Sequence, residues 1–201
     1  MTKKRVAVLI SGRGSNMTAL IEAARVRDYP AEIVLVVSNR PDASGLARAR
    51  LSGIETAVVD HTAFGEDREV FERALETKLQ AHLVDIVCLA GFMRLLTPRF
   101  VTRWSGRMLN IHPALLPQFK GLNTHRRALA AGVPHHGATV HFVVPEMDSG
   151  PIILQDSVPV VASDTEATLA ARVLEIEHRI YPQALRLVAE GRATLDANGS
   201  S

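Results

Sequence analysis

The sequence predicts an α/β fold in which a mostly parallel, twisted sheet carries helices on both of its faces. Short and almost continuously apolar runs, such as residues 86–90, are typical of strands that are covered on both sides. Longer amphipathic runs lie between them, and this alternation indicates right-handed crossovers between parallel strands. The length of 201 residues suits a single domain.

The elements of the first half follow directly from these patterns. Strands are expected at residues 6–10, 33–38, 56–59, 86–90 and 108–111, and helices at residues 16–26, 43–51 and 66–83. In the helix at 66–83, the apolar residues Val70, Phe71, Ala74 and Leu75 recur at helical spacing.

The second half changes character. Residues 138–144 and 152–160 are strand-like, and the loop that joins them is rich in Pro, Asp and Gly, with no room for a helix. We expect these strands to run antiparallel to the rest, which gives a mixed sheet. Residues 165–189 form a long amphipathic helix, for which Asp164 or Ser163 would be the N-cap and Gly191 the stop.

Composition excludes several classes of protein. The chain is 47% hydrophobic and 22% charged, as is usual for soluble globular proteins, and its net charge of +2 does not suggest a nucleic-acid surface. No apolar run is long enough to cross a membrane, and no secretory signal is recognisable. The single cysteine, Cys88, suits a reducing compartment and is expected to be buried and inert. We expect a cytoplasmic monomer or homodimer, with one domain at residues 1–195 and a flexible tail at 196–201.

Asn110, His112 and Asp148 together form a set of groups that can handle an oxyanion and a proton. An amide N–H donates to developing negative charge, an imidazole donates or accepts, and a carboxylate orients and charges that imidazole. His112 stands at the end of an expected buried strand, where open α/β sheets bind their ligands. No nucleophile stands beside the three residues, which favours direct transfer between two bound substrates. Taken singly, His112 could be structural and Asp148 an ordinary turn residue.

The turn at residues 11–16 (SGRGSN) lies between the first strand and the first helix and favours an anion. Glycines permit a tight turn, and the start of a helix offers free N–H groups. Met17 occupies the position of the third glycine of a dinucleotide fingerprint, and the Lys-Ser/Thr pair of a P-loop is missing. The turn therefore predicts a phosphate monoester rather than NAD or ATP. The alternative is a simple turn in which Ser15 or Asn16 caps the helix.

Histidines elsewhere in the chain raise the question of a metal site. His125, His135, His136 and His141 show no clean ligand spacing, and no carboxylate or thiolate completes a set with them. We expect no metal cofactor.

Four motifs carry a resemblance to a known family. They are residues 10–16 (ISGRGSN), 89–96 (LAGFMRLL), 109–113 (LNIHP) and 148–153 (DSGPII). Through these motifs the chain resembles the phosphoribosylglycinamide formyltransferases, the folate-dependent enzymes of purine synthesis, over nearly its whole length. The resemblance implies a Rossmann-like formyltransferase fold, with a phosphate-binding half at about residues 1–105 and a catalytic and folate half at about residues 106–195.

The resemblance also assigns roles to single residues. Gly14, Ser15 and Asn16 would hold the 5′-phosphate of glycinamide ribonucleotide, and Pro113 and Glu177 would contact the rest of that substrate. The co-substrate 10-formyltetrahydrofolate would be bound by Arg68, Met93, Arg94, Leu95, Leu96, Asn110 and Val144. Spacing alone would instead place Glu177 on a solvated helix face.

The sequence departs from the commoner family pattern at Lys120 and Asn123, where proline and histidine are more frequent. Asn110, His112 and Asp148 are unchanged, so the departure concerns the geometry of this loop rather than the reaction.

These residues predict a direct reaction in which the glycinamide amine attacks the formyl carbon of the folate. Asn110 and His112 would donate to the oxyanion, Asp148 would stabilise the charged imidazole, and the amine proton would pass to N10. Methionyl-tRNA formyltransferases and formyltetrahydrofolate hydrolases resemble the same catalytic half, but they carry an additional domain for which we expect this chain to have no room. A non-catalytic nucleotide-binding module is the alternative from a different class.

Overall fold

Seven strands form one sheet in the structure, a computed structural model that describes residues 2–195. The strand order is β3-β2-β1-β4-β5-β6-β7. β1 to β5 pair in parallel, whereas β6 runs antiparallel to both β5 and β7. The expected mixed sheet is therefore confirmed, although only one of the two late strands is reversed, since β7 points the same way as β5.

The strands lie within a few residues of their expected positions. They are β1 Lys4–Ile10, β2 Ala31–Ser38, β3 Thr56–Val58, β4 Ile86–Leu89, β5 Met108–His112, β6 His135–Phe142 and β7 Ile152–Pro159. The helices are α1 Ser15–Ala24, α2 Gly45–Leu51, the 3₁₀ helix η1 His61–Phe64, α3 Arg68–Ala81, α4 Pro98–Arg103, α5 Thr124–Ala131 and α6 Glu166–Ala189. The three short helices η1, α4 and α5 were not expected. For α4 a signal was present, because Thr97 caps the helix and Pro98 occupies its first turn.

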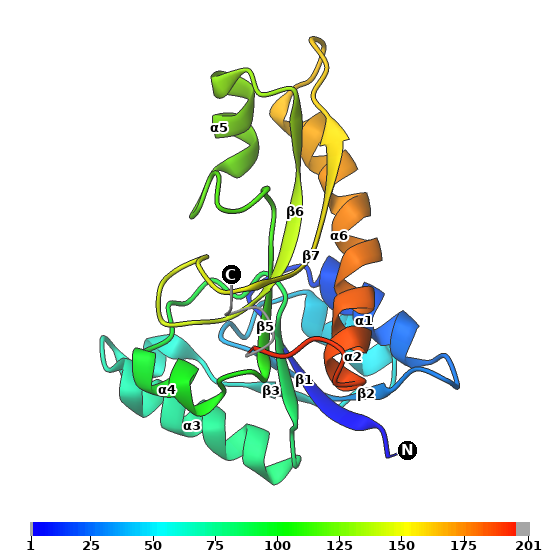
Figure 1. The fold of residues 1–201 in the computed structure, drawn as a ribbon. Helices are drawn as coiled ribbons and strands as arrows, with labels where there is room; N and C mark the ends of the chain where they lie inside the picture. The colour runs from blue at the N-terminus through cyan, green and yellow to red at the C-terminus, as the bar shows by residue number, and fades with distance from the viewer. Residues whose placement is uncertain (1, 196–201) are drawn as a thin grey trace.

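The sheet is buried on both faces. Along β1, Val6 and Val8 belong to one core cluster, together with residues of α1, α2 and α6. Ala7 and Leu9 belong to a second cluster, which α3 and α4 complete. The two groups of helices accordingly lie on opposite sides of the sheet (Figure 1). This double coverage explains why the strands appear in the sequence as continuous apolar runs.

The start of α6 differs from the expectation. The Thr165 hydroxyl accepts the Thr168 N–H at 3.2 Å, and the Thr168 hydroxyl accepts the Thr165 N–H at 2.9 Å, which is a reciprocal capping box. The expected cap, Asp164 or Ser163, is therefore wrong: the Asp164 carboxylate accepts from the Val161 N–H at 2.9 Å instead. Gly191, with a φ of 71°, follows the end of the helix, as expected for a stop.

Cys88 lies in β4 with no exposed surface, and burial raises the pKa of its thiol to about 12. The thiol is therefore an inert part of the core. No helix within residues 2–195 has the length and hydropathy that a membrane span requires. The expected flexible tail, residues 196–201, lies outside the described residues.

Candidate active site

The structure brings Asn110, His112 and Asp148 together beside the end of β5. Asn110 and His112 lie on β5, and Asp148 lies in the loop of residues 143–151 between β6 and β7, here named the Asp148 loop. This loop folds back so that the Asp148 Oδ2 atom is 3.5 Å from His112 Nδ1. Only 7% of the His112 side chain and 11% of the Asp148 side chain are exposed. The partial burial strengthens electrostatic interactions between the two groups.

The His112 ring has a defined orientation. Its Nε2 atom lies 3.0 Å from the carbonyl oxygen of Phe119, and a carbonyl can only accept, so Nε2 carries a hydrogen. Nδ1 faces Asp148 at a distance longer than an ordinary hydrogen bond. When the ring is protonated, the Nδ1–H can therefore be shared between the carboxylate and an oxygen of a ligand.

Asp148 is held by the backbone of a second loop. The Gly121 N–H donates to Asp148 Oδ2 at 2.8 Å. Asp148 itself has a φ of 50°, in the left-handed region, which Asp tolerates better than most residues. The carboxylate thus faces His112 only while the residues around positions 121 and 148 keep this arrangement.

His141 is a fourth member of the cluster and was missed by the sequence analysis. Its Nδ1 lies 2.9 Å from the Phe142 carbonyl oxygen and must donate, so the neutral ring has an accepting Nε2. The amide Nδ2 of Asn110 donates to this Nε2 at 3.2 Å. Burial lowers the pKa of His141 and favours the neutral form, although the Phe142 carbonyl and the Asp148 charge act in the opposite direction.

The turn after β1 offers free N–H groups at the start of α1. Gly14 occupies the N-cap position with a φ of 68° and a ψ of 36°, and no side chain of a described residue caps the helix there. The alternative expectation, a cap by Ser15 or Asn16, is therefore wrong. A Cβ at Gly14 would lie 3.2 Å from the Cα of Gly45, so the turn is packed closely against α2. An uncapped helix start of this kind suits an anion.

Asn16 and Glu177 are joined although they lie far apart in the sequence. The Asn16 amide Nδ2 donates to the Glu177 carboxylate at 2.5 Å, and both residues are 8% exposed. Burial raises the pKa of Glu177, which the hydrogen bond from Asn16 opposes. Glu177 is therefore not on a solvated helix face, and it lies next to the turn for which a phosphate is expected.

A cleft of about 280 Å³ lies where the strand order of the sheet reverses, at the carboxyl ends of β1 and β4. Ligands of open α/β sheets bind at such points. The cleft is lined by Ser11, Gly12, Asn39, Arg40, His61, Gly91, Met93 and Arg94. Two residues of the expected folate site, Met93 and Arg94, are thus part of its wall.

Four residues of the expected folate site, Met93 to Leu96, lie in a segment that is fixed at both ends. The Ser11 hydroxyl accepts from the Met93 N–H at 2.7 Å, and Glu72 accepts from the Thr97 N–H at 2.5 Å. Between these anchors Met93 and Leu95 are each 64% exposed, which leaves apolar surface for an aromatic ligand. Leu96 and Val144 are half-buried, and Arg68 and Arg94 make no ion pair with any residue from 2 to 195. Pro113, which is expected to contact the ribonucleotide, is also half-buried. Ser11 and Glu72, which hold the two ends of this segment, were not identified from the sequence.

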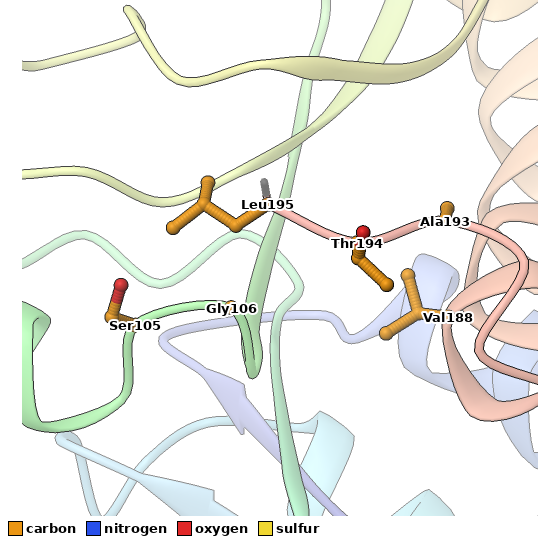
Figure 2. Close-up of a pocket in the computed structure, with 6 residues that line it drawn as sticks. All are labelled: Ser105, Gly106, Val188, Ala193, Thr194 and Leu195. Carbon is orange, nitrogen blue, oxygen red and sulfur yellow. The ribbon is translucent and has the colours of Figure 1, made fainter. Parts of the chain in front are cut away.

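A second cleft, of about 240 Å³, lies away from the cluster of Asn110, His112 and Asp148 (Figure 2). Ser105 and Gly106 on its wall precede β5, whereas His112 is the last residue of that strand. The two regions therefore lie at opposite ends of β5. The cleft is lined by Ser105, Gly106, Val188, Ala193, Thr194 and Leu195, none of which is titratable. It offers no group for acid–base chemistry. Within residues 2–195, no group of three or more His, Cys, Asp or Glu side chains could hold a metal ion.

Comparison with known proteins places the chain in a family. The formyl transferase family profile matches residues 4–185. This chain belongs to the formyl transferase family. It is 47% identical to the phosphoribosylglycinamide formyltransferase of Escherichia coli over 195 residues, which cover 97% of this chain and 92% of that protein.

Other relatives agree in fold and differ in length. The crystal structure of the phosphoribosylglycinamide formyltransferase from Brucella melitensis matches with a TM-score of 0.90 and 52% identity, covering 94% of this chain and 96% of that chain. The fold expected for this formyl transferase is thereby confirmed. The human trifunctional purine biosynthetic protein adenosine-3 is 51% identical over 98% of this chain, but the chain spans only 19% of that protein's length.

Proposed function

We propose that this formyl transferase moves the formyl group of 10-formyltetrahydrofolate to the amine of glycinamide ribonucleotide, a step of purine synthesis. The observation that carries the proposal is the cluster of Asn110, His112 and Asp148, with the 3.5 Å contact between the His112 ring and the Asp148 carboxylate. The amide and the imidazole supply hydrogen-bond donors for an oxyanion, and the carboxylate supplies a negative charge that stabilises the charged imidazole.

The reaction starts when the amine nitrogen attacks the formyl carbon, which forms a new C–N bond and turns the formyl oxygen into an oxyanion. One hydrogen of the Asn110 amide is donated to His141, and the second, which has no partner among residues 2–195, can be donated to this oxyanion. The Nδ1–H of protonated His112 is the other donor. The bond between the formyl carbon and N10 then breaks, and the proton released by the amine passes to N10. The products are tetrahydrofolate and the formylated ribonucleotide.

Asp148 acts on the charge of His112. The negative charge of the carboxylate, 3.5 Å from Nδ1, attracts the Nδ1–H of the charged ring, and a charged donor binds an oxyanion more strongly than a neutral one. Loss of one such donor costs roughly 3–4 kcal/mol of transition-state stabilisation. The proposed roles of Asp148 and His112 are thus coupled, and removal of either leaves the other less effective.

The substrates are assigned to neighbouring regions of the site. The phosphate of the ribonucleotide binds the N–H groups at the start of α1, where Gly14, Ser15 and Asn16 lie, and the rest of the molecule extends past Glu177 and Pro113. The folate binds along the segment from Met93 to Leu96, with Val144 and the free guanidinium groups of Arg68 and Arg94 around it. The placement of the folate is supported by the cleft at the carboxyl ends of β1 and β4, because Met93 and Arg94 lie on its wall.

Near-ultraviolet absorbance tests the proposal, because loss of the formyl group changes the spectrum of the folate. The purified chain is mixed with 10-formyltetrahydrofolate, with and without glycinamide ribonucleotide. We expect a spectral change that depends on the ribonucleotide, with formylated ribonucleotide as product. A change without it would indicate a hydrolase, and no change under either condition would leave only a binding function.

A further inference from the structure

Two loops that approach each other over the proposed site are joined by a lysine. They are the Asp148 loop and the loop of residues 117–123 between β5 and α5, here named the Lys120 loop. The Lys120 ammonium donates to the Ser149 hydroxyl oxygen at 2.6 Å. This bond lies directly beside the one from the Gly121 N–H to the Asp148 carboxylate at 2.8 Å. The two loops are therefore held together at adjacent residues on both sides.

The Ser149 hydroxyl transmits the effect of Lys120 to the backbone of the Asp148 loop. It accepts from the ammonium and donates to the Met147 carbonyl at 3.0 Å, so both of its roles are used. Met147 and Ser149 flank Asp148, whose φ of 50° is a disfavoured conformation for a residue with a side chain. A contact that restrains both neighbours also restrains the direction in which the Asp148 carboxylate points.

Lys120 is itself fixed from the other side. The Arg127 guanidinium, on α5, donates to the Lys120 carbonyl at 2.6 Å and lies 5.6 Å from the centre of the Phe119 ring. The Phe119 carbonyl, in turn, accepts from His112 Nε2 at 3.0 Å. Lys120 therefore lies between the residue that orients His112 and the residue that holds Asp148.

We propose that Lys120 is a positioning residue for the formyl transfer and that it acts through Ser149 to keep the Asp148 carboxylate facing His112. The inference rests on the proposed function of the cluster. An ammonium bonded to a hydroxyl is a charge-assisted hydrogen bond, which is stronger than its neutral counterpart. Asn123 supports the same loop, because it takes the left-handed conformation, with a φ of 57°, that the chain needs to enter α5.

The first test compares Lys120→Met with Lys120→Arg. Met keeps much of the aliphatic chain and removes the donor, whereas Arg restores a cationic donor of similar reach. We expect Lys120→Met to lower kcat by roughly 10-fold or more, since a small displacement of a catalytic group has large effects on rate. We expect an almost unchanged KM for the ribonucleotide and recovery of most of kcat in Lys120→Arg. Arg126→Met, an exposed cation of α5 with no assigned role, is the matched control and should behave as the wild type.

A double-mutant cycle with Ser149→Ala then tests the path of the effect. If Lys120 acts through the hydroxyl, Ser149→Ala lowers kcat by itself, and the double variant is no slower than the slower single variant. Additive losses, or a normal kcat in both single variants, would overturn the inference. Because Ser149→Ala is a small exposed change, the cycle remains informative even if Lys120→Met folds poorly.

The wild-type rate separates this inference from the proposed function. A wild-type protein that transfers no formyl group would contradict the function. An active wild type with insensitive Lys120 and Ser149 variants would contradict only the positioning role.

Discussion

The amide nitrogen of Asn110 lies 3.2 Å from Nε2 of His141, at directly opposite positions of β5 and β6. Since Nδ1 of His141 donates to the Phe142 carbonyl, Nε2 has to accept. This contact decides that the nitrogen of the Asn110 carboxamide, rather than its oxygen, lies on the side of His141. A ligand oxygen on the nitrogen side of this group therefore meets a donor in a fixed orientation, which is what oxyanion stabilisation requires.

The replacement His141→Phe tests this role of the imidazole. A phenyl ring has a similar size but cannot accept, so the Asn110 amide loses the partner that orients it. We expect kcat to fall, though by less than the roughly 10²–10³-fold loss that follows removal of the donor itself in Asn110→Ala. Steady-state kinetics at saturating substrates provide the measurement. His135→Phe, the same change at an exposed position of β6, is the control, and equal effects in both variants would argue against a specific role of His141.

The replacement Asp148→Asn tests the charge that faces His112. The side chain keeps its size and an oxygen that can accept from the Gly121 N–H, so the loop should keep its conformation. The imidazolium loses its carboxylate, and we expect kcat to fall by roughly 10²–10⁴, the range of positioned acid–base groups. The thermal unfolding midpoint should remain near that of the wild type. Glu146→Gln, an exposed change in the same loop, is the control. A near-normal kcat in Asp148→Asn would make Asp148 an ordinary turn residue.

The fold could be predicted from the sequence because its signals are local. Continuous apolar runs such as Ile86–Leu89 mark buried strands, and the spacing of apolar residues in α3 marks a helix. The short helices α4 and α5 were missed because a single turn or two carries too few apolar positions to show a period. The cap of α6 was misassigned because Asp164, Ser163 and Thr165 are all capping residue types, and only geometry separates them.

The candidate site was predictable only in part, because its members are joined by register and loop geometry. Asn110, His112 and Asp148 carry recognisable chemistry, so their types and motifs indicated them. His141 orients Asn110 only through the cross-strand register of β5 and β6, which no local pattern encodes. The bond between Asn16 and Glu177 depends in the same way on the packing of α1 against α6.

The replacement Asn16→Ala tests the phosphate-binding turn. It removes the hydrogen bond to Glu177 and leaves a buried carboxylate without this donor beside the phosphate. We expect the apparent KM for the ribonucleotide to rise, while the KM for the folate stays nearly constant, because the reacting groups are remote from the turn. Glu22→Ala, an exposed change on the same helix, should leave both constants unchanged. An unchanged KM for the ribonucleotide in Asn16→Ala would argue against the phosphate site.

The pH dependence of stability should reflect a set of covered histidines near the Lys120 loop. His136 has no exposed surface, and neither of its ring nitrogens makes a hydrogen bond of ordinary geometry with a described residue. Its ring packs edge-on against Phe119 and His125. Burial, followed by the charges of His125 and His112, lowers the pKa of His136 to about 4. Burial is also the largest cause of the lowered pKa values of His125, His141 and His178.

These groups fix the direction of the effect. The unfolded chain, in which a histidine has a pKa of about 6.5, binds more protons than the folded chain at pH values below that. The contribution of these histidines to the free energy of unfolding therefore has its full value above about pH 6.5. It decreases as the pH falls toward 4. Urea unfolding at a series of pH values should show this decrease. In His136→Phe the decrease should be smaller, because one group that takes up a proton on unfolding is gone, whereas His135→Phe should keep the wild-type slope. A slope that His136→Phe does not reduce would show that the acid sensitivity arises elsewhere.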